Sequence, residues 1–455
     1  GGGDGSPIGL PAGSGPHAGT VDPLAYRPAL DAELTQRATL GYSHTLFALS
    51  PGGAETTARR VSRFRSRIEH AARAGNVDPD LLEAIVFLES AGRPDVIAGG
   101  SDPASAAGLT QILAQTGSGL LGMHVDLAAS KRLTARYLQA LRRGHPAAAA
   151  RALAQRRRVD DRFDPAKALA ATVRYLRIAH GQLHRDDLAV VSYHMGIGNL
   201  QSVQSAYGDT KAGYPQLFFD STPLRHATAW AKLQRLGDDS ATYFWRVLAA
   251  ARIMRLYRSD PAQLHRLAAL QTAKGSQEEV FHRLSETKVF DAPSDIADAR
   301  RSGYLTALPG SPARLCFRID ARMGELASKL GQSPALYRAL RPAALALARY
   351  VGGGVRVISG SPAALTMSSS VRDRRYQTLL GLTNPEATHA YSLHTTGYAF
   401  DALRRYPTRA QAVAFQFLLD RLQAFNLLAW VREPAAIHMT ASSEAAGLPA
   451  AFKRD

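Results

Sequence analysis

The segment Asp78–Ser90 constrains the fold of this chain more than any other, because it is an apolar helix that carries a glutamate in its last turn. Asp78 suits the N-cap position and Pro79 the first helical position. The apolar residues that follow recur at helical spacing and predict a mostly buried helix. Glu89 comes just before the helix-breaking run 91–94, so the helix end and partial burial should both raise its pKa. Glu89 is therefore a candidate general acid, with a solvated residue at a helix end as the alternative.

Two further motifs follow the pair Glu89-Ser90 along the chain. The first is Gly108-Leu109-Thr110-Gln111-Ile112, and the second is Tyr193-His194-Met195-Gly196-Ile197-Gly198. Glu-Ser, Gly-Leu-x-Gln-Ile and Tyr-x-x-Gly-x-Gly, in this order, resemble the motifs of the soluble lytic transglycosylase domain, a relative of goose-type lysozyme. The resemblance covers roughly residues 78–207. It implies a mainly α-helical, lysozyme-like domain that cleaves the MurNAc–GlcNAc bond of peptidoglycan.

The same resemblance implies roles for individual residues. Glu89 would protonate the leaving oxygen and then, as a base, take the proton of the sugar's own 6-hydroxyl, which closes a 1,6-anhydro ring. Ser90, Gln111 and Tyr193 would contact the substrate. His194 stands where the family has asparagine, and a neutral imidazole cannot replace an amide as both donor and acceptor.

The loop before Gln111 departs from the family pattern. Asp102, Ser105 and Thr110 stand where the family has serine, glycine and methionine. A goose-type hydrolase could place a second acid here, at Asp95 or Asp102. Two carboxyl groups that flank a scissile bond give hydrolysis when one of them activates water. A water-using muramidase is therefore the alternative to a transglycosylase.

Changes in composition along the 455 residues predict several domains. Residues 1–24 are rich in Gly, Ser and Pro and predict a flexible tether. Residues 25–77 form a helical lead-in, with one basic amphipathic helix expected over Thr56–Ala74. The lysozyme-like domain follows at 78–207 and a helical accessory region at 208–309, which ends in a turn-rich stretch.

The last part, residues 310–455, predicts an α+β domain. Helical patterns over Leu315–Tyr350 give way to a β-branched run, Val355–Ser359, that predicts a strand. Thr408–Phe425 predicts an amphipathic helix, and two strand-like runs follow it, over Leu427–Arg432 and Ala436–Thr440.

Three side chains in this last part suit one zinc ion. His394 and Asp401 lie seven residues apart across a bend with a glycine, and His438 on a later strand could supply the third ligand, which leaves the fourth position to water. Ordinary hydrogen-bonded residues are the alternative for a His-x6-Asp pair alone. The full string Ser-x-His-x-x-Gly-x-Ala-x-Asp over 392–401 resembles the zinc D-alanyl-D-alanine peptidase family, whose members cut stem peptides of peptidoglycan.

The peptidase resemblance extends to Arg372, which would bind substrate and steady the developing oxyanion. The family usually ends in Glu-x-x-His, but here Glu433 precedes His438 by five residues. The two extra residues, with Pro434 among them, predict a bulge or a turn. Glu433 remains the candidate base that takes a proton from water. If it points elsewhere, the domain binds zinc and the wall peptide without cutting it.

The net charge of +17 draws this chain to polyanions. The sequence has no zinc-finger, ribonucleoprotein or helix-turn-helix signature, so a wall polymer fits better than a specific nucleic acid. No apolar run reaches the length of a membrane span, and the single Cys316 excludes an internal disulfide framework. The first residue is Gly, so a targeting segment is expected to have been removed. The oligomeric state stays open.

These features together predict a bifunctional peptidoglycan-remodelling enzyme of the bacterial cell envelope, periplasmic or extracellular. Its partners would be glycan strands and stem peptides, and its cofactor a zinc ion in the last domain only. Two other classes stay open: a muramidase with a non-catalytic wall-binding domain, and a nucleic-acid binder suggested by charge alone.

Overall fold

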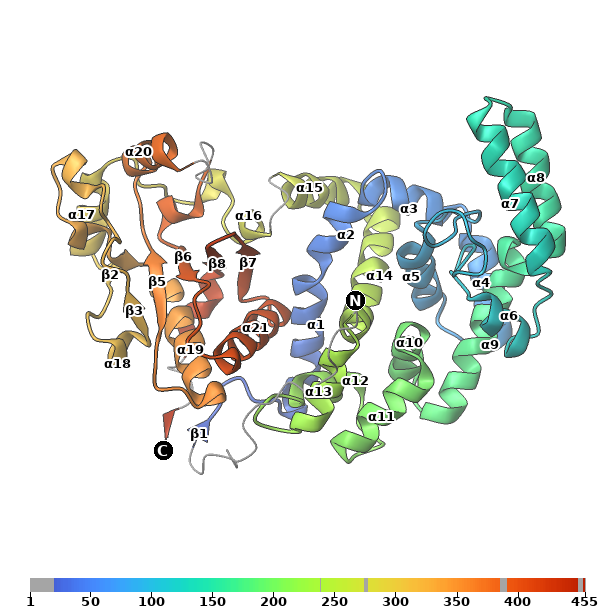
Figure 1. Cartoon of the computed structure of the whole chain (residues 1–455), viewed down its shortest axis with the longest axis horizontal. Helices are drawn as coiled ribbons and strands as arrows, with labels where there is room; N and C mark the ends of the chain where they lie inside the picture. The colour runs from blue at the N-terminus through green and yellow to red at the C-terminus, as the bar shows by residue number, and fades with distance from the viewer. Residues whose placement is uncertain (1–19, 238, 274–276, 385–390, 449–452, 455) are drawn as a thin grey trace. The chain divides into compact units, whose positions relative to one another are not determined.

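The computed structural model describes residues 20–237, 239–273, 277–384, 391–448 and 453–454 (Figure 1). The chain divides into two compact units. We call them the helical unit (residues 45–218 and 228–269) and the mixed unit (1–44, 219–227 and 270–455). Most of the tether expected over 1–24 lies outside the described residues. No helix in the described ranges combines the length and the apolar character needed to cross a membrane.

The described part of the helical unit contains helices and isolated bridges but no strand. Its helices, including those that begin or end in the mixed unit, are α2 (Ser43–Leu49), α3 (Ala54–Ser62), α4 (Arg65–Gly75), α5 (Pro79–Ser90), α6 (Ala114–Gly119), α7 (Leu127–Arg142), α8 (Pro146–Val159), α9 (Pro165–Leu183), α10 (Asp186–Met195), α11 (Ile197–Tyr207), α12 (Tyr214–Asp220), α13 (Ala227–Arg235), α14 (Tyr243–Ser259) and α15 (Pro261–Thr272).

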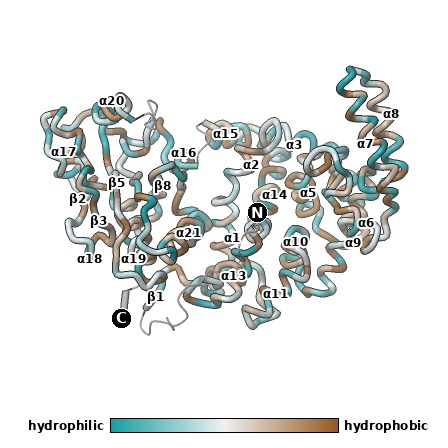
Figure 2. The backbone as a smooth tube through the Cα atoms, viewed as in Figure 1, coloured by the Kyte–Doolittle hydropathy of each residue, from teal (hydrophilic) through white to brown (hydrophobic). Residues whose placement is uncertain are grey.

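Helix α5 is the central helix of this unit, as its apolar sequence predicts. It packs against α3, α4 and α14, and its tube is mostly brown in the hydropathy colouring of Figure 2. The Asp78 carboxylate accepts the backbone N–H of Asp80, and Pro79 is the first helical residue, so the predicted cap is confirmed. Ala91 ends the helix in the left-handed conformation, with φ at 53°.

The prediction of a single helix over Thr56–Ala74 is wrong, because the segment forms two helices, α3 and α4. A tight turn separates them, in which the N–H of Phe64 donates to the carbonyl of Val61. The break lets the two halves meet different neighbours, because α3 packs on α14 while α4 packs on α9. Tertiary packing thus overrides a continuous amphipathic pattern.

The mixed unit is built on a five-stranded sheet in the order β3-β5-β6-β8-β7. Its strands are β3 (Phe317–Ile319), β5 (Leu365–Ser369), β6 (Ala399–Leu403), β7 (Leu428–Arg432) and β8 (Ala436–Ala441). Strands β3 and β5 pair parallel, and the other pairs are antiparallel. Helices α19 (Pro342–Ser359) and α21 (Arg409–Ala424) pack on each other and on the sheet. The two predicted C-terminal strands and the helix before them are confirmed.

The remaining elements of the mixed unit are short, apart from α1 and α20. They are β1 (Thr20–Val21), α1 (Asp31–Gly41), α16 (Glu278–Phe281), α17 (Pro293–Arg301), β2 (Thr306–Ala307), α18 (Pro312–Leu315), β4 (Ala339–Leu340), α20 (Arg374–Thr383) and β9 (Lys453–Arg454).

Two secondary-structure predictions for the mixed unit are wrong. Val355–Ser359 is not a strand but the last part of α19, and the helix predicted from Leu315 begins only at Pro342. At Gly352 an added Cβ would lie 2.4 Å from the carbonyl oxygen of Cys316. The glycine therefore allows α19 to approach the backbone closely. Burial along this helix decides the conformation of its β-branched end against local propensity.

The division into units differs from the expected domain boundaries. Helix α14, from the expected accessory region 208–309, packs directly on α5 in the helical unit. Residues from 270 onward belong to the mixed unit, where His282 stacks on Tyr398 with ring centroids 3.6 Å apart. The accessory region is therefore divided, because its two halves pack into different cores.

Candidate active site and candidate metal centre

Glu89 lies in the last turn of α5 and meets a tyrosine from α14. The hydroxyl of Tyr243 donates a hydrogen bond of 2.8 Å to Oε1 of Glu89. Burial raises the pKa of Glu89 to about 7, although this hydrogen bond and the charge of Arg246 act in the opposite direction. Near neutral pH a large fraction of the carboxyl is therefore protonated, which is the state a general acid requires.

Tyr193 also lies in the surroundings of Glu89, at the end of α10. Its hydroxyl donates a hydrogen bond of 2.6 Å to the carbonyl of Thr110, so it ties α10 to the Gly108–Ile112 motif. Burial and then the charge of Glu89 raise the pKa of Tyr193. The structure thus brings the three motifs together around one carboxyl.

His194 supports Tyr243. The two rings stack with centroids 5.0 Å apart, and Nδ1 of His194 lies 2.7 Å from Oγ of Ser240. His194 therefore orders the tyrosine that holds the Glu89 carboxyl, a role that an imidazole can fill with one hydrogen bond.

Sequence reasoning missed Tyr243, because it lies 154 residues after Glu89 in a region expected to be accessory. The local signal is the aromatic run Tyr243-Phe244-Trp245, but such a run is equally typical of core packing. Phe244 and Trp245 are indeed buried, and so is the ring of Tyr243. Only the tertiary contact distinguishes its hydroxyl from those of other buried tyrosines.

Replacing Tyr243 with phenylalanine tests this contact. The hydrogen bond stabilises the charged form of Glu89, so its loss raises the pKa of Glu89 further. We expect the alkaline limb of the pH–kcat/KM profile for glycan cleavage to move to higher pH. Tyr207→Phe, a tyrosine of α11, is the control and should leave the limb in place. An unmoved limb in Tyr243→Phe would contradict the assignment of Glu89 as the titrating acid.

Gln111 occupies a strained backbone position in the Gly108–Ile112 motif, next to the residue that Tyr193 contacts. Its φ is +53°, and its amide nitrogen donates to the carbonyls of Val96 and Gly108 at 3.1 and 2.9 Å. Within the described residues its amide oxygen has no hydrogen-bond partner. That oxygen is placed to accept a hydrogen bond from a ligand such as an acetamido N–H.

A buried ion pair anchors the same loop. Arg162 and Asp160 are both fully buried, with Nη2 and Oδ2 2.8 Å apart. Arg162 also donates to three loop carbonyls, those of Pro103 at 2.6 Å, Ser105 at 3.0 Å and Ile112 at 3.2 Å. These five residues were not predicted as a group, because single arginines carry no signal in a basic sequence.

Three of the predicted or alternative site residues have other contacts. Ser90, expected to bind substrate, is only 1% exposed, and its hydroxyl donates back to the carbonyl of Val86 in α5. Its place on the core side of α5 keeps it from the surface that a substrate could reach. Asp95 pairs with Arg157 at 2.8 Å, and Asp102 lies 3.4 Å from Lys131.

The mixed unit brings His394, Asp401 and His438 together. Their possible ligand atoms all lie within 4.8 Å of one another. Oδ1 of Asp401 is 3.2 Å from Nε2 of His394 and 2.9 Å from Nδ1 of His438. Ligand atoms of a tetrahedral zinc ion lie about 3.4 Å apart, since each zinc bond is about 2.0–2.2 Å long. The two distances from the carboxylate oxygen to the ring nitrogens are close to this value, so the three residues are candidate ligands of a zinc ion.

The sheet register produces this cluster. Asp401 of β6 lies directly opposite His438 of β8, so both side chains point to the same face. His394 lies in the 3₁₀ turn Leu393–Thr396, just before β6. Gly397 ends this turn, with a φ of +78°. A hydrogen bond of 2.8 Å between its Nδ1 and the carbonyl of Ser370 leaves Nε2 directed at Asp401.

Electrostatics act in opposite directions on the two histidines of the cluster. Burial opposes a charge on His438, but hydrogen bonds with Asp401 and Glu278 outweigh it and raise the pKa of His438 to about 10. Burial and the charge of Arg372 lower the pKa of His394. A metal that binds here would displace the proton of His438, so its affinity would rise with pH.

Glu278 of α16 is a further residue at this cluster that sequence reasoning missed. Its Oε2 lies 2.7 Å from Nε2 of His438 and accepts a hydrogen bond of 2.9 Å from Thr440. A carboxylate on the far nitrogen of a ligating histidine fixes the orientation of its ring. No motif pointed to Glu278, because it lies 160 residues before His438.

Arg372 and Glu433 also lie on this side of the mixed unit. Nη2 of Arg372 is 3.6 Å from Oδ2 of Asp401, and the charge of Glu433 acts on Arg372. Glu433 opens the turn between β7 and β8, where its N–H donates to the carbonyl of Ala436. The expected turn between Glu433 and His438 is confirmed, and His438 lies opposite Val431, two residues before Glu433.

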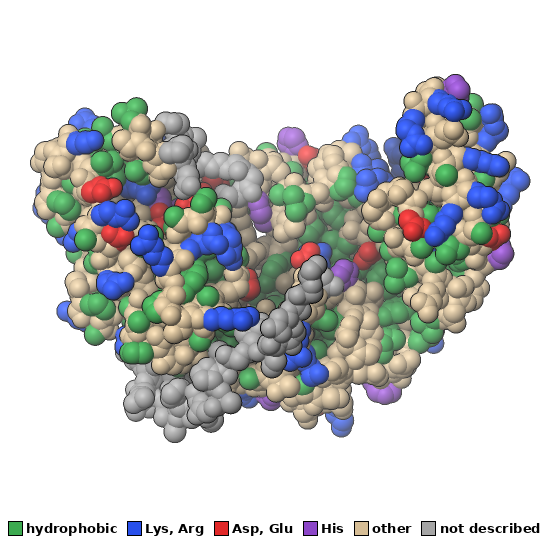
Figure 3. Space-filling model, viewed as in Figure 1, with side chains coloured by type: hydrophobic (Ala, Val, Ile, Leu, Met, Phe, Trp, Pro, Cys, Tyr) green, Lys and Arg blue, Asp and Glu red, His purple; other side chains and the backbone are tan. Residues whose placement is uncertain are grey.

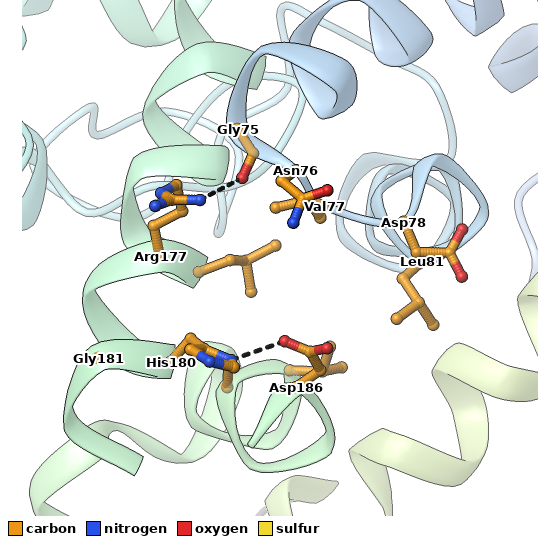
Figure 4. A pocket seen from close by; sticks show the side chains of 12 residues that line it. Gly75, Asn76, Val77, Asp78, Leu81, Arg177, His180, Gly181 and Asp186 are labelled. Atoms are coloured by element: carbon orange, nitrogen blue, oxygen red, sulfur yellow. Dashed lines mark hydrogen bonds and ion pairs between the residues drawn. The ribbon is translucent and has the colours of Figure 1, made fainter. Parts of the chain in front are cut away.

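A separate cavity of about 430 Å³ lies at the other end of α5 (Figure 4). Asp78, the N-cap of that helix, lines it together with Arg177, His180 and Asp186. His180 and Asp186 pair across it at 2.7 Å. Because Glu89 lies in the last turn of α5, this cavity is more than two helical turns away and is not part of the candidate active site.

Residues 145–214 match the family described as Transglycosylase SLT domain. The matched segment runs from the start of α8 to the start of α12 and includes Tyr193 and His194, while Glu89 and the metal cluster lie outside it. The match indicates a peptidoglycan lytic transglycosylase activity, and with it an enzyme that acts on the cell wall. No curated protein matches the chain.

Proposed function

We propose that this chain remodels peptidoglycan with two active sites, one for glycan strands and one for stem peptides. The observation that carries the proposal is Glu89, a carboxyl with a pKa of about 7 held by Tyr243, in a unit that contains the matched transglycosylase segment. The proposed place of action is the bacterial cell envelope, either periplasmic or extracellular.

In the glycan site, protonated Glu89 gives its proton to the glycosidic oxygen between MurNAc and GlcNAc as that bond breaks. The Glu89 carboxylate then accepts the proton of the MurNAc 6-hydroxyl, while the oxygen of that hydroxyl bonds to the anomeric carbon. Glu89 is therefore protonated again at the end of the reaction. Gln111 offers its amide oxygen to the substrate. Tyr243 steadies the carboxylate between the two steps, because its hydrogen bond favours the charged form.

Two ion pairs favour this single-acid reaction over hydrolysis. The alternative needs a second carboxylate that activates water. The candidates were Asp95 and Asp102, and both pair with cations of the α7–α8 hairpin, Arg157 and Lys131. Engagement in these ion pairs leaves each carboxylate less suited to act as a base.

In the peptide site, His394, Asp401 and His438 would hold a zinc ion through Nε2, Oδ1 and Nδ1. Zinc supplies Lewis-acid activation of water for peptide hydrolysis. Arg372 would bind the substrate and stabilise negative charge that develops on the scissile carbonyl oxygen. A carboxylate oxygen of Glu433 would take the proton from the attacking water.

Digestion of purified peptidoglycan tests both sites at once. We expect wild type to release 1,6-anhydro-muropeptides and trimmed stem peptides, resolved by mass spectrometry. Glu89→Gln should lose only the anhydro products, by at least about a hundredfold. His394→Ala should lose only the trimming, together with the bound zinc measured by elemental analysis. His265→Ala, an exposed histidine of the helical unit, is the control and should keep both.

Other product patterns would support a different function. Reducing ends in place of anhydro sugars would identify a water-using muramidase. Bound zinc without peptide products would make the mixed unit a wall-binding domain. Glycan cleavage that survives Glu89→Gln would contradict the first site.

A further inference from the structure

The hairpin of α7 and α8, residues 127–159, is here called the basic arm. It contains nine Lys and Arg residues and not one Asp or Glu, in a chain whose net charge is +17. Its two helices pack side by side and are joined by the short turn 143–145. Figure 3 shows blue Lys and Arg side chains along this hairpin. This short segment therefore holds a large share of the positive charge of the chain.

Eight of these nine cations are exposed, and only Arg156 is buried. Arg132 and Arg136 lie four residues apart on one face of α7, and Arg143, the C-cap residue seven positions further on, continues that face. Arg151 and Arg158 share a face of α8 in the same way. The arm thus presents rows of cations rather than scattered charges.

Within the arm these charges oppose folding. Like charges four residues apart, such as Arg132 and Arg136, destabilise a helix, and the arm has no carboxylate to pair with them internally. Many alanines in α8 compensate through their helix propensity. Rows of cations without neighbouring carboxylates, on a stable hairpin, attract a polyanion from outside the chain.

The base of the arm is tied to the active-site loop. Arg156 donates to the carbonyl of Asp95 at 3.0 Å, Arg157 pairs with its carboxylate at 2.8 Å, and Lys131 lies 3.4 Å from Asp102. Both aspartates belong to the loop that connects Glu89 with Gln111. A polymer bound along the arm would therefore be held at a fixed position relative to the glycan site.

We infer that the basic arm binds the carboxylate-bearing stem peptides of peptidoglycan and so retains the polymer during glycan cleavage. This inference rests on the proposed substrate of the helical unit. Arginine suits the partner, because its planar guanidinium binds carboxylates through two parallel hydrogen bonds.

The surface of the arm disfavours two other polyanions. A membrane surface calls for apolar side chains beside the cations, but Leu141 is the one large hydrophobic residue of the arm that is strongly exposed. Single-stranded nucleic acid calls for exposed aromatic rings, whereas the arm has a single aromatic residue, Tyr137, and it lies near the guanidinium of Arg156.

Sedimentation with intact peptidoglycan tests the inference in a Glu89→Gln background, where the polymer stays uncut. The arm variant carries Arg132→Gln, Arg136→Gln and Arg143→Gln. The control variant loses the same charge at Arg63, Arg67 and Arg266, which are exposed residues of the same unit outside the arm. At low salt we expect the arm variant to bind about tenfold more weakly and the control to bind like the parent, with the difference disappearing at high salt.

Three outcomes would overturn the inference. Equal weakening of both variants would assign binding to net charge alone, and unchanged binding of the arm variant would remove the arm from it. Preferential loss of binding to anionic phospholipid vesicles or DNA, measured in parallel, would assign the arm to a different partner. Because binding is measured without cleavage, these outcomes are independent of whether wild type forms anhydro products. A thermal melt of each variant confirms that its fold is intact.

Discussion

Replacing Arg162 with methionine is expected to lower the free energy of unfolding by about 3–5 kcal/mol, which is the usual cost of leaving a buried charge without its partner. The variant leaves the buried carboxylate of Asp160 uncompensated. It also removes the donor shared by the carbonyls of Pro103, Ser105 and Ile112. Urea denaturation of the full chain, followed by far-UV circular dichroism, measures the change.

Arg157→Met is the matched control for this prediction. Arg157 pairs with Asp95 at a similar distance, but 42% of its side chain is exposed. Solvent screens such a pair, so the expected loss is at most about 1 kcal/mol. If the two variants lost the same stability, burial would not be the reason for the importance of Arg162.

The arginine also bears on the geometry of the glycan site. Gly108 lies against the Arg162 backbone, where an added Cβ would come within 1.8 Å of the carbonyl oxygen, and its φ is +82°. The loop can therefore close over the Asp160–Arg162 pair only with glycine at this position. Folded Arg162→Met protein should cleave glycan slowly, because Gln111 loses the support of its loop.

The second large effect concerns the stability of Glu89→Gln as a function of pH. The folded chain raises the pKa of Glu89 from 4.5 to about 7. Below pH 4.5 the carboxyl is protonated in both states, and the charge costs the folded state nothing. Between pH 4.5 and 7 the unfolded chain loses the proton that the folded chain still holds, so stability falls over this range. Above pH 7 both states are charged, and the full loss remains. At pH 8 we expect Glu89→Gln to be more stable than wild type by about 3 kcal/mol, with no such advantage near pH 4.5.

Glu69→Gln gives the control with the opposite sign. A hydrogen bond from Arg65 lowers the pKa of Glu69, so its charge favours the folded state and its loss should destabilise the chain more at pH 8 than in acid. Thermal melts of both variants across this pH range provide the comparison. A Glu89→Gln variant that is less stable than wild type at pH 8 would contradict the raised pKa of Glu89 in the folded chain. We expect Glu89→Gln to gain stability and lose activity, because a buried charge that the reaction needs destabilises the folded protein.

Local sequence was sufficient for several parts of this protein. The cap at Asp78, the apolar helix α5, the C-terminal strands and the motif around His394 depend on spacing within short segments. Local propensity and periodicity determine such features. The glycan motifs and the candidate metal ligands could therefore be named as residues, although not as assembled sites.

Local sequence failed where packing decided the conformation. Val355–Ser359 has the residues of a strand but forms the end of α19, because α19 is buried against the sheet and α21. The lead-in helix is split between different neighbours. In both cases the gain from tertiary burial exceeds the small preference of the backbone.

The sequence by itself determined which residues are candidates for chemistry: Glu89 at a helix end, and His394, Asp401 and His438 at spacings that suit one metal ion. Only the tertiary structure decided what surrounds them. Tyr243 reaches Glu89 across 154 residues, Glu278 reaches His438 across 160, and Arg162 reaches the loop from a separate turn. A pKa or a ligand orientation depends on burial and on partners a few ångströms away. Contacts between residues so far apart in the chain exist only after folding, which is why no local pattern predicted them.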